Sequence, residues 1–367
     1  MLAIVSDNRE PTEDHAIKAE ELLVLTCCSA AIDKASAPRV RSLIGPGLDW
    51  ERVLGLAHKE RVIPLLSGFL NSVCPDLLPD AIKHALKQRL IEVTGVGLVL
   101  GSEIAAVIDL IAAGGVRVLT FKGPSLGIAA FGDPLARMFG DIDLLVDQTD
   151  FAACQAHLLA NDYTIVEDYV FEKTLQREGS WAAVDLHRTI TPEAFPCRLA
   201  FDELWDRREM VTVFGHDVPS LSNTDHLLAH CLQTTHDRYQ NRLLLAKLAD
   251  IAGLLRNTPD IDWDRLLAMA ADSGMTRRLL IALGAASDMF DCSLPPQVAT
   301  LLGETKSLRN LGQFTGRGVL EQENRGIVGF VERVTYHYQV HERARDKLAQ
   351  ARMVSLKLRQ AWAKSTI

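Results

Sequence analysis

The feature that most constrains the fold is a change of residue pattern at Gly114-Gly115. Before it, apolar residues recur every three or four positions through residues 15–114, as in WERVLGLAHKERVIPLLSGFL, which predicts a series of helices. After it comes VRVLTF, a short β-branched and apolar run typical of a buried strand, and residues 122–125 then form a tight turn. The chain therefore combines helical regions with a mixed core that begins near residue 115.

The pattern beyond the turn predicts the rest of that core. Residues 126–131 indicate a short helix, DIDLLV a second buried strand, residues 150–160 a helix, and TIVEDYVFEK and WAAVDLH two further strands. The helical period returns from Thr224 and persists to the end, while Asp49 and Asp262 each precede a helical pattern as N-caps do. We expect an α+β fold in which a small mixed sheet, residues 115–220, is flanked by helical regions 1–114 and 221–367.

Composition narrows the class of protein. Ser102 and Glu103 interrupt the longest apolar stretch, the N-terminal residues lack a signal-peptide pattern, and seven unevenly spaced cysteines suggest no disulfide framework. We expect a cytoplasmic protein that does not enter a membrane. The formal charge of −8 argues against binding along a long nucleic acid. The basic segment that follows His341 is either a solvated helix face or a binding site for an RNA end.

A D-x-D sequence lies on the predicted second strand of the core. Alternate side chains of a strand share one face, so Asp141 and Asp143 project together, about 7 Å apart along the chain, while Ile142 points into the core. A divalent cation with hard oxygen ligands neutralises such a pair, and Mg²⁺ also binds substrate phosphates. A two-metal site needs a third carboxylate nearby, for which Asp185 on the following strand is the candidate. This pattern suits metal-assisted phosphoryl transfer.

The order of strand, Gly turn, short helix and D-x-D strand resembles the polymerase-β-type nucleotidyltransferase superfamily. Within it, the chain resembles a bacterial family of uncharacterised nucleotidyltransferases over roughly residues 49–300, through segments that include LTFKGPSLGIAAFGDPLARMFGDIDLLV, VDLH and HLLAHCLQTTHDRYQNRLLLAKLADI. The resemblance implies that Asp141, Asp143 and Asp185 bind Mg²⁺ or Mn²⁺. It also implies a nucleotide-phosphate role for the Lys122-Gly123 turn.

The turn departs from the usual superfamily sequence, because Pro124 follows Gly123 where Gly or Ser is usual. Lys122 either supplies a cation for the phosphates, assisted by Ser125 and backbone amides, or is a surface lysine. Arg137 either clamps a triphosphate or pairs with Asp133.

Histidines and charged residues further along the chain are candidates for the acceptor side of the site. His187 lies two residues after Asp185 on the same strand face. His226 and His230 share a helix face, but the segment lacks the Glu of a zinc-protease motif. The proposed acceptor-side residues, for each of which packing or surface pairing is the alternative, are His187, His230, His236, Arg242 and Asp250.

These expectations describe a metal-dependent nucleotidyltransferase. It would move a nucleotidyl group from a nucleoside triphosphate to an acceptor, with release of pyrophosphate. The acceptor is left open among a small molecule, a peptide, a protein side chain and an RNA end. The alternative is a nucleotide- or partner-binding module that keeps the fold without catalysis, and metal-dependent pyrophosphate release distinguishes the two.

Overall fold

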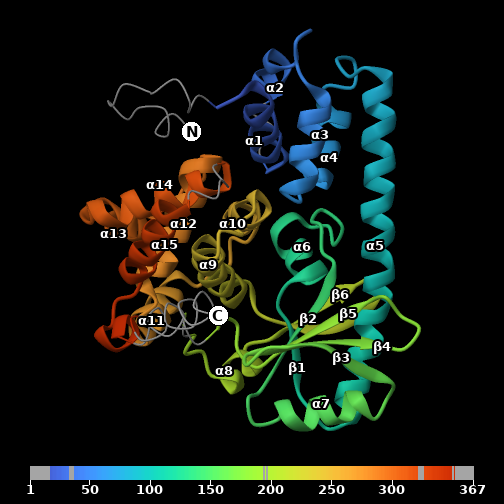
Figure 1. The fold of residues 1–367 in the computed structure, drawn as a ribbon, viewed down its shortest axis with the longest axis vertical. Coiled ribbons are helices and arrows are strands. Elements are labelled where there is room, and N and C mark those ends of the chain that lie inside the picture. Colours follow the sequence, from blue (N-terminus) through green and yellow to red (C-terminus); the bar gives the residue numbers. More distant parts are fainter. Residues whose placement is uncertain are drawn as a thin grey trace, which may run out of the picture.

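The computed structural model describes residues 17–32, 37–192, 195, 197–320, 326–348 and 351. Most of the basic C-terminal segment, including Arg352, Lys357, Arg359 and Lys364, lies outside the described residues. The described chain forms a helical part and a mixed sheet, as Figure 1 shows. The predicted α+β class is therefore confirmed.

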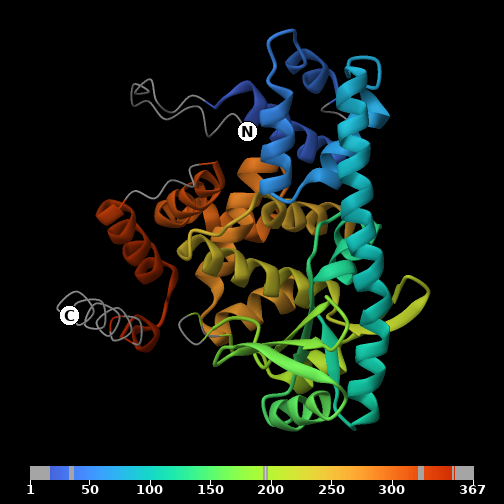
Figure 2. The ribbon, with the colours of Figure 1, turned by 45° about the vertical axis from the view of Figure 1, so that its right-hand side comes forward.

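The N-terminal helices lead to one long helix that joins the two parts. They are α1 (Ala19–Ile32), α2 (Ala37–Leu43), α3 (Trp50–Lys59), α4 (Ile63–Val73) and α5 (Asp80–Ala113). Asp49 caps α3 as predicted, since its side chain accepts a hydrogen bond from the Arg52 amide. Helix α5 runs from the N-terminal helices to the far edge of the sheet (Figure 2). The boundary predicted near residue 114 thus marks the end of a helix shared by both parts.

Helix α5 is also long and apolar enough, by length and composition, to cross a membrane. Its C-terminal half buries Ile104, Val107, Ile108 and Ile111 in the core behind the sheet. A core helix of a soluble protein passes the same test, so a single helix of this kind is weak evidence for a membrane span.

The sheet has seven strands in the order β3-β4-β5-β2-β1-β7-β6. Strand β1 pairs antiparallel with β2 and parallel with β7, and β2 pairs parallel with β5. The core elements are β1 (Val118–Thr120), α6 (Gly123–Phe131), β2 (Asp141–Val146), α7 (Phe151–Leu159), β3 (Tyr163–Asp168), β4 (Glu172–Arg177), β5 (Ala183–His187), α8 (Phe201–Asp206), β6 (Glu209–Val213) and β7 (His216–Ser220).

The segment TIVEDYVFEK forms two strands, contrary to the prediction of one. Strands β3 and β4 are an antiparallel hairpin that turns after Asp168, where the Tyr169 amide donates to the Glu172 carbonyl. The segment contains no Gly or Pro, so its sequence gives no sign of the turn.

Alternation along the strands sorts their side chains between two faces. Ile142, Leu144 and Val146 of β2 pack behind the sheet against α5 and α7, whereas Leu145 packs with residues of α8 and α9 on the opposite face. Asp141 and Asp143 share the face of Leu145 by this alternation. The acidic residues therefore face the helical part of the molecule.

The C-terminal helices complete that helical part. They are α9 (Asn223–Tyr239), α10 (Leu245–Asn257), α11 (Trp263–Ser273), α12 (Thr276–Phe290), α13 (Pro296–Glu304), α14 (Lys306–Leu320) and α15 (Gly326–Val340). Asp262 caps α11 as predicted, by accepting a hydrogen bond from the Arg265 amide.

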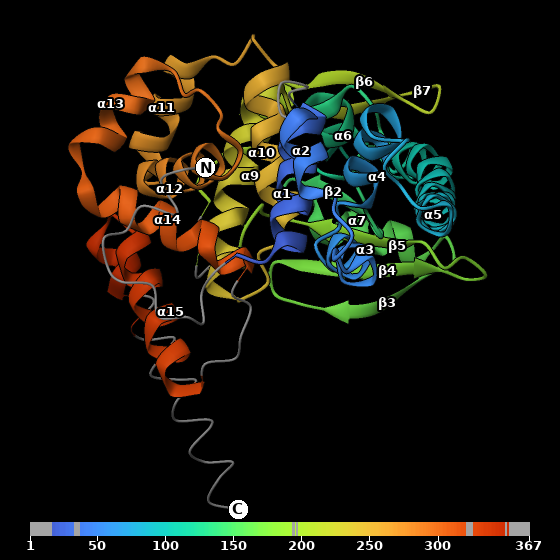
Figure 3. The same cartoon turned by 90° about the horizontal axis from the view of Figure 1, so that it is seen from above.

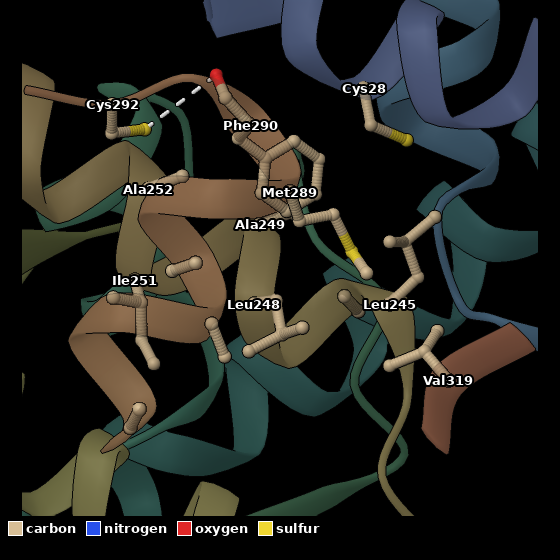
Figure 4. Close-up of a cluster of buried hydrophobic side chains, with 14 of the residues drawn as sticks. Cys28, Leu245, Leu248, Ala249, Ile251, Ala252, Met289, Phe290, Cys292 and Val319 are labelled. Carbon is tan, nitrogen blue, oxygen red and sulfur yellow. Dashed lines mark hydrogen bonds between the residues drawn. The ribbon is translucent and has the colours of Figure 1, made fainter. Parts of the chain in front are cut away.

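The helices from the two ends of the chain share one hydrophobic core. Leu245, Leu248 and Ala249 of α10 belong to one cluster of buried side chains with Cys28 of α1 and Met289 of α12, drawn in Figure 4. Seen from above, α9 and α10 lie in the middle, with α11, α12, α13 and α14 on one side and α1, α6 and the sheet on the other (Figure 3). The N- and C-terminal regions therefore pack into one unit, which holds α9 and α10 beside the sheet.

Candidate functional site

Neighbouring strands β2 and β5 place the acidic residues side by side. The two strands are parallel, and their register puts Asp143 opposite Asp185 and Leu145 opposite His187. Side chains two residues apart on a strand share a face, so Asp141, Asp143, Asp185 and His187 all project toward the helices. The convergence expected from the D-x-D pattern follows from this register.

Three of these residues offer ligand atoms at metal-binding separation. One atom each of Asp143, Asp185 and His187 lies within 4.8 Å of the other two. Asp141 is not part of this group, although it stands close enough to Asp143 for their charges to interact. The histidine expected on the acceptor side therefore stands among the metal-ligand candidates, while Asp141 lies at the margin of the group.

Lys122 approaches the site from the end of β1. Its Nζ donates to Asp143 Oδ1 over 2.5 Å and lies 4.9 Å from the centroid of the Phe121 ring. Although burial disfavours the charged form, the carboxylates of Asp143 and Asp141 raise the pKa of Lys122. Lys122 is thus a cation of the site rather than a surface lysine, and its phosphate role stays a prediction.

His187 connects two carboxylates. Its Nε2 lies 2.9 Å from Asp143 Oδ1, its Nδ1 lies 3.2 Å from Glu172 Oε2, and its ring packs edge-on against Phe121. Glu172 faces His187 across the antiparallel β4-β5 pair. Sequence reasoning missed Glu172, because its place beside His187 depends on the unpredicted β3-β4 turn.

The carboxylates differ in the direction of their pKa shifts. Although burial opposes it, Lys122 and His187 hold the pKa of Asp143 well below its usual range. The negative charge of Asp143 and then burial raise the pKa of Asp141, while burial and Asp143 raise that of Asp185 to about 6. The Thr174 hydroxyl donates to Asp185 Oδ1 over 2.7 Å and partly opposes that rise. Among the residues that the structure describes, the positive charges near Asp141 and Asp185 do not offset these effects.

This chemistry fits a divalent cation. Carboxylate oxygens are the ligands that Mg²⁺ and Mn²⁺ prefer. A cation held by Asp143 and Asp185 would add positive charge and so oppose the rise in the pKa values of Asp141 and Asp185. Lys122 and His187 both contact Oδ1 of Asp143, so these two contacts leave Oδ2 for a ligand.

The turn after Lys122 is built around Gly123, which adopts the left-handed conformation (φ +56°) at the start of α6. Ser125, proposed to assist phosphate binding, is buried, and its hydroxyl lies 2.8 Å from that of Thr120. The hydroxyl therefore faces the interior, and the expectation that it contacts nucleotide is wrong for this conformation.

Arg137 has a partner that the sequence analysis did not consider. Its guanidinium donates to Asp250 Oδ2 over 3.2 Å and to the Gly123 carbonyl over 3.3 Å, whereas the Asp133 carboxylate accepts from the Leu135 amide. Neither alternative, a triphosphate clamp or a pair with Asp133, fits these contacts. Arg137 instead connects the Lys122-Gly123 turn to α10.

His230 and Asp250 belong to the same buried network. His230 Nε2 lies 3.2 Å from Asp250 Oδ2, and the side chains are 2% and 1% exposed. Although burial would raise it, Arg137 and His230 lower the pKa of Asp250. An acceptor cannot reach groups this deep, so the expectation that they line the acceptor side is wrong. Together with Arg137, they form an Arg137–Asp250–His230 network that supports the turn.

The remaining acceptor-side candidates lie where α9 ends. His236 is buried, packs edge-on against Phe195 and has its Nδ1 3.4 Å from Asp237 Oδ1. Arg242 is exposed, and its amide donates to the Asp237 carbonyl. Asp237 itself accepts from Lys247 Nζ over 2.5 Å, and its charge reaches Lys122. Asp237 and Lys247 are thus members of this region that the sequence analysis missed.

Comparison with known proteins gives a family for most of the chain. A search of curated proteins finds no match. An antigenic nucleotidyltransferase-like protein from Paracoccidioides brasiliensis is 16% identical in sequence, with a TM-score of 0.33 over 53% of this chain and 93% of that one. Residues 46–291 match the family described as uncharacterised nucleotidyltransferase. This match covers well over half of the sequence and includes both acidic strands, the Lys122-Gly123 turn and helices α9 and α10. The chain therefore belongs to the uncharacterised nucleotidyltransferase family.

Proposed function

We propose that the protein is a metal-dependent enzyme that transfers a nucleotidyl group from a nucleoside triphosphate to an acceptor, with release of pyrophosphate. The observation that carries this proposal is the convergence of Asp143, Asp185 and His187 beside Lys122 and Asp141. Membership of a nucleotidyltransferase family supports a nucleotide as the substrate.

Asp143 and Asp185, with Asp141 or His187, would bind Mg²⁺ or Mn²⁺, and the ion would stabilise the developing negative charge on the phosphates. An acceptor oxygen bonds to the α-phosphorus while the bond from that phosphorus to the bridging oxygen of the β-phosphate breaks. The electron pair leaves with pyrophosphate, and the acceptor proton passes to solvent.

The protein's own residues would position these groups. Lys122 lies next to the carboxylates and can exchange its contact with Asp143 for a phosphate oxygen when a metal ion takes up the carboxylate charge. The Arg137–Asp250–His230 network fixes the turn that carries Lys122 and Gly123. His187 fixes the carboxylate of Asp143 and is itself oriented by Glu172.

The acceptor remains a small molecule, a peptide, a protein side chain or an RNA end in this proposal, and the location is proposed to be cytoplasmic. A coupled phosphate assay with inorganic pyrophosphatase tests the reaction. The four triphosphates are supplied with Mg²⁺ or Mn²⁺ and a lysate filtered into size fractions as the source of acceptor. We expect metal-dependent pyrophosphate release that stops when Asp143 is changed to Asn; binding of nucleotide without any release favours the inactive module.

A further inference from the structure

The hairpin formed by β3 and β4 ends in an exposed group of apolar side chains. Tyr169 and Val170 are 49% and 68% exposed, and the half-buried ring of Phe171 stacks on the ring of Tyr169 with centroids 6.3 Å apart. We call these three residues the aromatic tip. Single exposed apolar side chains are ordinary, whereas exposed apolar side chains that gather in one place mark binding sites. The aromatic tip is therefore a candidate contact surface.

Hydrogen bonds and register place the aromatic tip beside the candidate site. The Tyr169 amide donates to the Glu172 carbonyl over 3.0 Å, and Glu172 lies opposite His187 of β5. Glu172 Oε2 is in turn 3.2 Å from His187 Nδ1. The amide of Arg188, the residue after His187, donates to the Phe171 carbonyl over 3.1 Å. The tip is thus joined by direct contacts to the end of β5.

Tyr169 also projects from the face of the sheet that carries the site. The Glu172 side chain faces the site, since it contacts His187. Tyr169 is opposite Glu172 in the antiparallel hairpin, one position beyond the pair formed by Asp168 and Lys173. Side chains of directly opposed residues project from the same face of a sheet. Tyr169, Glu172 and His187 therefore form one row that crosses the hairpin and β5.

This row lies on the side of the metal-ligand candidates that is opposite the Lys122-Gly123 turn. In the sheet order β3-β4-β5-β2-β1, the turn follows β1, whereas Asp143 is on β2 and Asp185 on β5. A triphosphate at the turn would approach Asp143 from β1, which leaves the side of β5 and the hairpin to the acceptor. Neighbouring strands are about 4.8 Å apart, so β3 is about 10 Å from β5. About three residues of extended peptide span that distance.

The charges along the row favour a peptide acceptor over an RNA end. Glu167, two residues before Tyr169, lies on the same face. Its carboxylate raises the pKa of the Tyr169 hydroxyl, and Glu172 adds to that rise. Arg242, from the loop after α9, opposes them with a smaller effect. An RNA end would bring backbone phosphates among these carboxylates, where like charges repel, whereas a peptide backbone carries no charge.

We propose that the acceptor is a hydroxyl side chain of a peptide or protein segment, in which an apolar residue about three positions away packs on the aromatic tip. This inference rests on the proposed function and names its acceptor class. The hydroxyl oxygen bonds to the α-phosphorus, the hydroxyl proton passes to solvent, and pyrophosphate leaves with the electron pair. Tyr169 suits the contact because its ring offers a large apolar face with few rotatable bonds.

Label transfer to a positional peptide library tests the inference. The full chain is incubated with Mg²⁺ or Mn²⁺, the four nucleoside triphosphates labelled at the α-phosphate, and peptides that fix one Ser, Thr or Tyr and vary every other position. We expect the labelled peptides to share an aromatic or large aliphatic residue about two to four positions from the hydroxyl. For the best peptide, Tyr169→Ser should raise KM by about tenfold or more with kcat unchanged, while Tyr169→Phe keeps the parent's KM. The KM for the triphosphate should remain that of the parent in both variants.

Trp181→Ser is the matched control, because Trp181 is 51% exposed in the turn that follows the opposite end of β4; its KM for the peptide should remain that of the parent. RNA oligonucleotides and the small-molecule fraction of a lysate are tested as acceptors beside the peptides. Three results would overturn the inference alone: transfer to RNA or small molecules but not to peptides, labelling that ignores apolar residues, or an unchanged peptide KM in Tyr169→Ser. If no acceptor produced pyrophosphate release, the proposed function would fail, and this inference with it.

Discussion

Replacing Asp250 by Ala tests whether the Arg137–Asp250–His230 network supports the Lys122-Gly123 turn. Asp250 is 1% exposed and Arg137 11%, and their charged atoms are 3.2 Å apart. At this distance their attraction is about 5 kcal/mol for an effective dielectric constant of about 20, and the desolvation of both groups offsets part of it. Removing the carboxylate leaves a buried guanidinium with no counter-charge, which typically costs about 3–5 kcal/mol.

We therefore expect Asp250→Ala to lower the free energy of unfolding by about 3–5 kcal/mol, measured by urea denaturation with an unchanged m-value. Arg137→Met should restore part of that loss in the double variant, because it removes the unpaired charge. The double variant should nevertheless bind nucleotide more weakly than the parent, because the Gly123 carbonyl loses its hydrogen bond from Arg137. Two results would refute the reasoning: a double variant whose loss equals the sum of the Asp250→Ala and Arg137→Met losses within about 0.5 kcal/mol, or a cost below about 1 kcal/mol for Asp250→Ala alone.

Two further predictions concern stability. Burial lowers the pKa of His226 to about 3, so in the folded protein it stays neutral where the unfolded chain takes up a proton. Stability should consequently fall by up to about 1.4 kcal/mol per pH unit as the pH decreases from about 6.5 to 3, and His226→Gln should reduce this slope in urea titrations; an unchanged slope contradicts the assignment. A Cβ at Gly253 would lie 2.6 Å from the Ala130 carbonyl oxygen, where α10 crosses α6, whereas one at Gly55 meets nothing within 4 Å. Gly253→Ala should therefore destabilise by about 1–3 kcal/mol and Gly55→Ala should stabilise by up to about 1 kcal/mol in thermal unfolding, and a similar change in both would contradict the packing argument.

The parts of the site that lie within one strand were predictable from the sequence. Alternation alone placed Asp141 and Asp143 on one face, and the second acidic strand supplied Asp185 and His187 on the same side. The caps Asp49 and Asp262 were predictable for a similar reason, because the residues that accept and donate are three positions apart.

The contacts that join distant segments were not predictable. Arg137 and Asp250 are 113 residues apart, and the burial of Asp250 and His230 depends on how α9 and α10 pack against α6. Glu60 meets the start of α10 across 185 residues, and the sequence gives no sign of this contact. Residue type suggested function for His230 and Ser125, but whether a side chain faces the site or the interior is decided by tertiary packing.

The same packing decides the stability of the metal-free Asp143→Asn variant. If repulsion between the carboxylates dominated, this variant would melt slightly above the parent. Lys122 and His187 instead stabilise the charge of Asp143. The metal-free variant should consequently melt below the parent, because it loses charge-assisted hydrogen bonds that typically contribute about 1.5–3 kcal/mol each.

The central claim is that Asp143 binds the metal ion that nucleotide requires. Its most direct test is the shift in melting temperature produced by Mg²⁺ with nucleoside triphosphate, measured on the parent and on Asp143→Asn at equal ligand concentration. A ligand at one hundred times its dissociation constant stabilises the native state by about 2.7 kcal/mol. We predict a clear upward shift for the parent and none for Asp143→Asn, and an equal shift in both proteins would contradict the account.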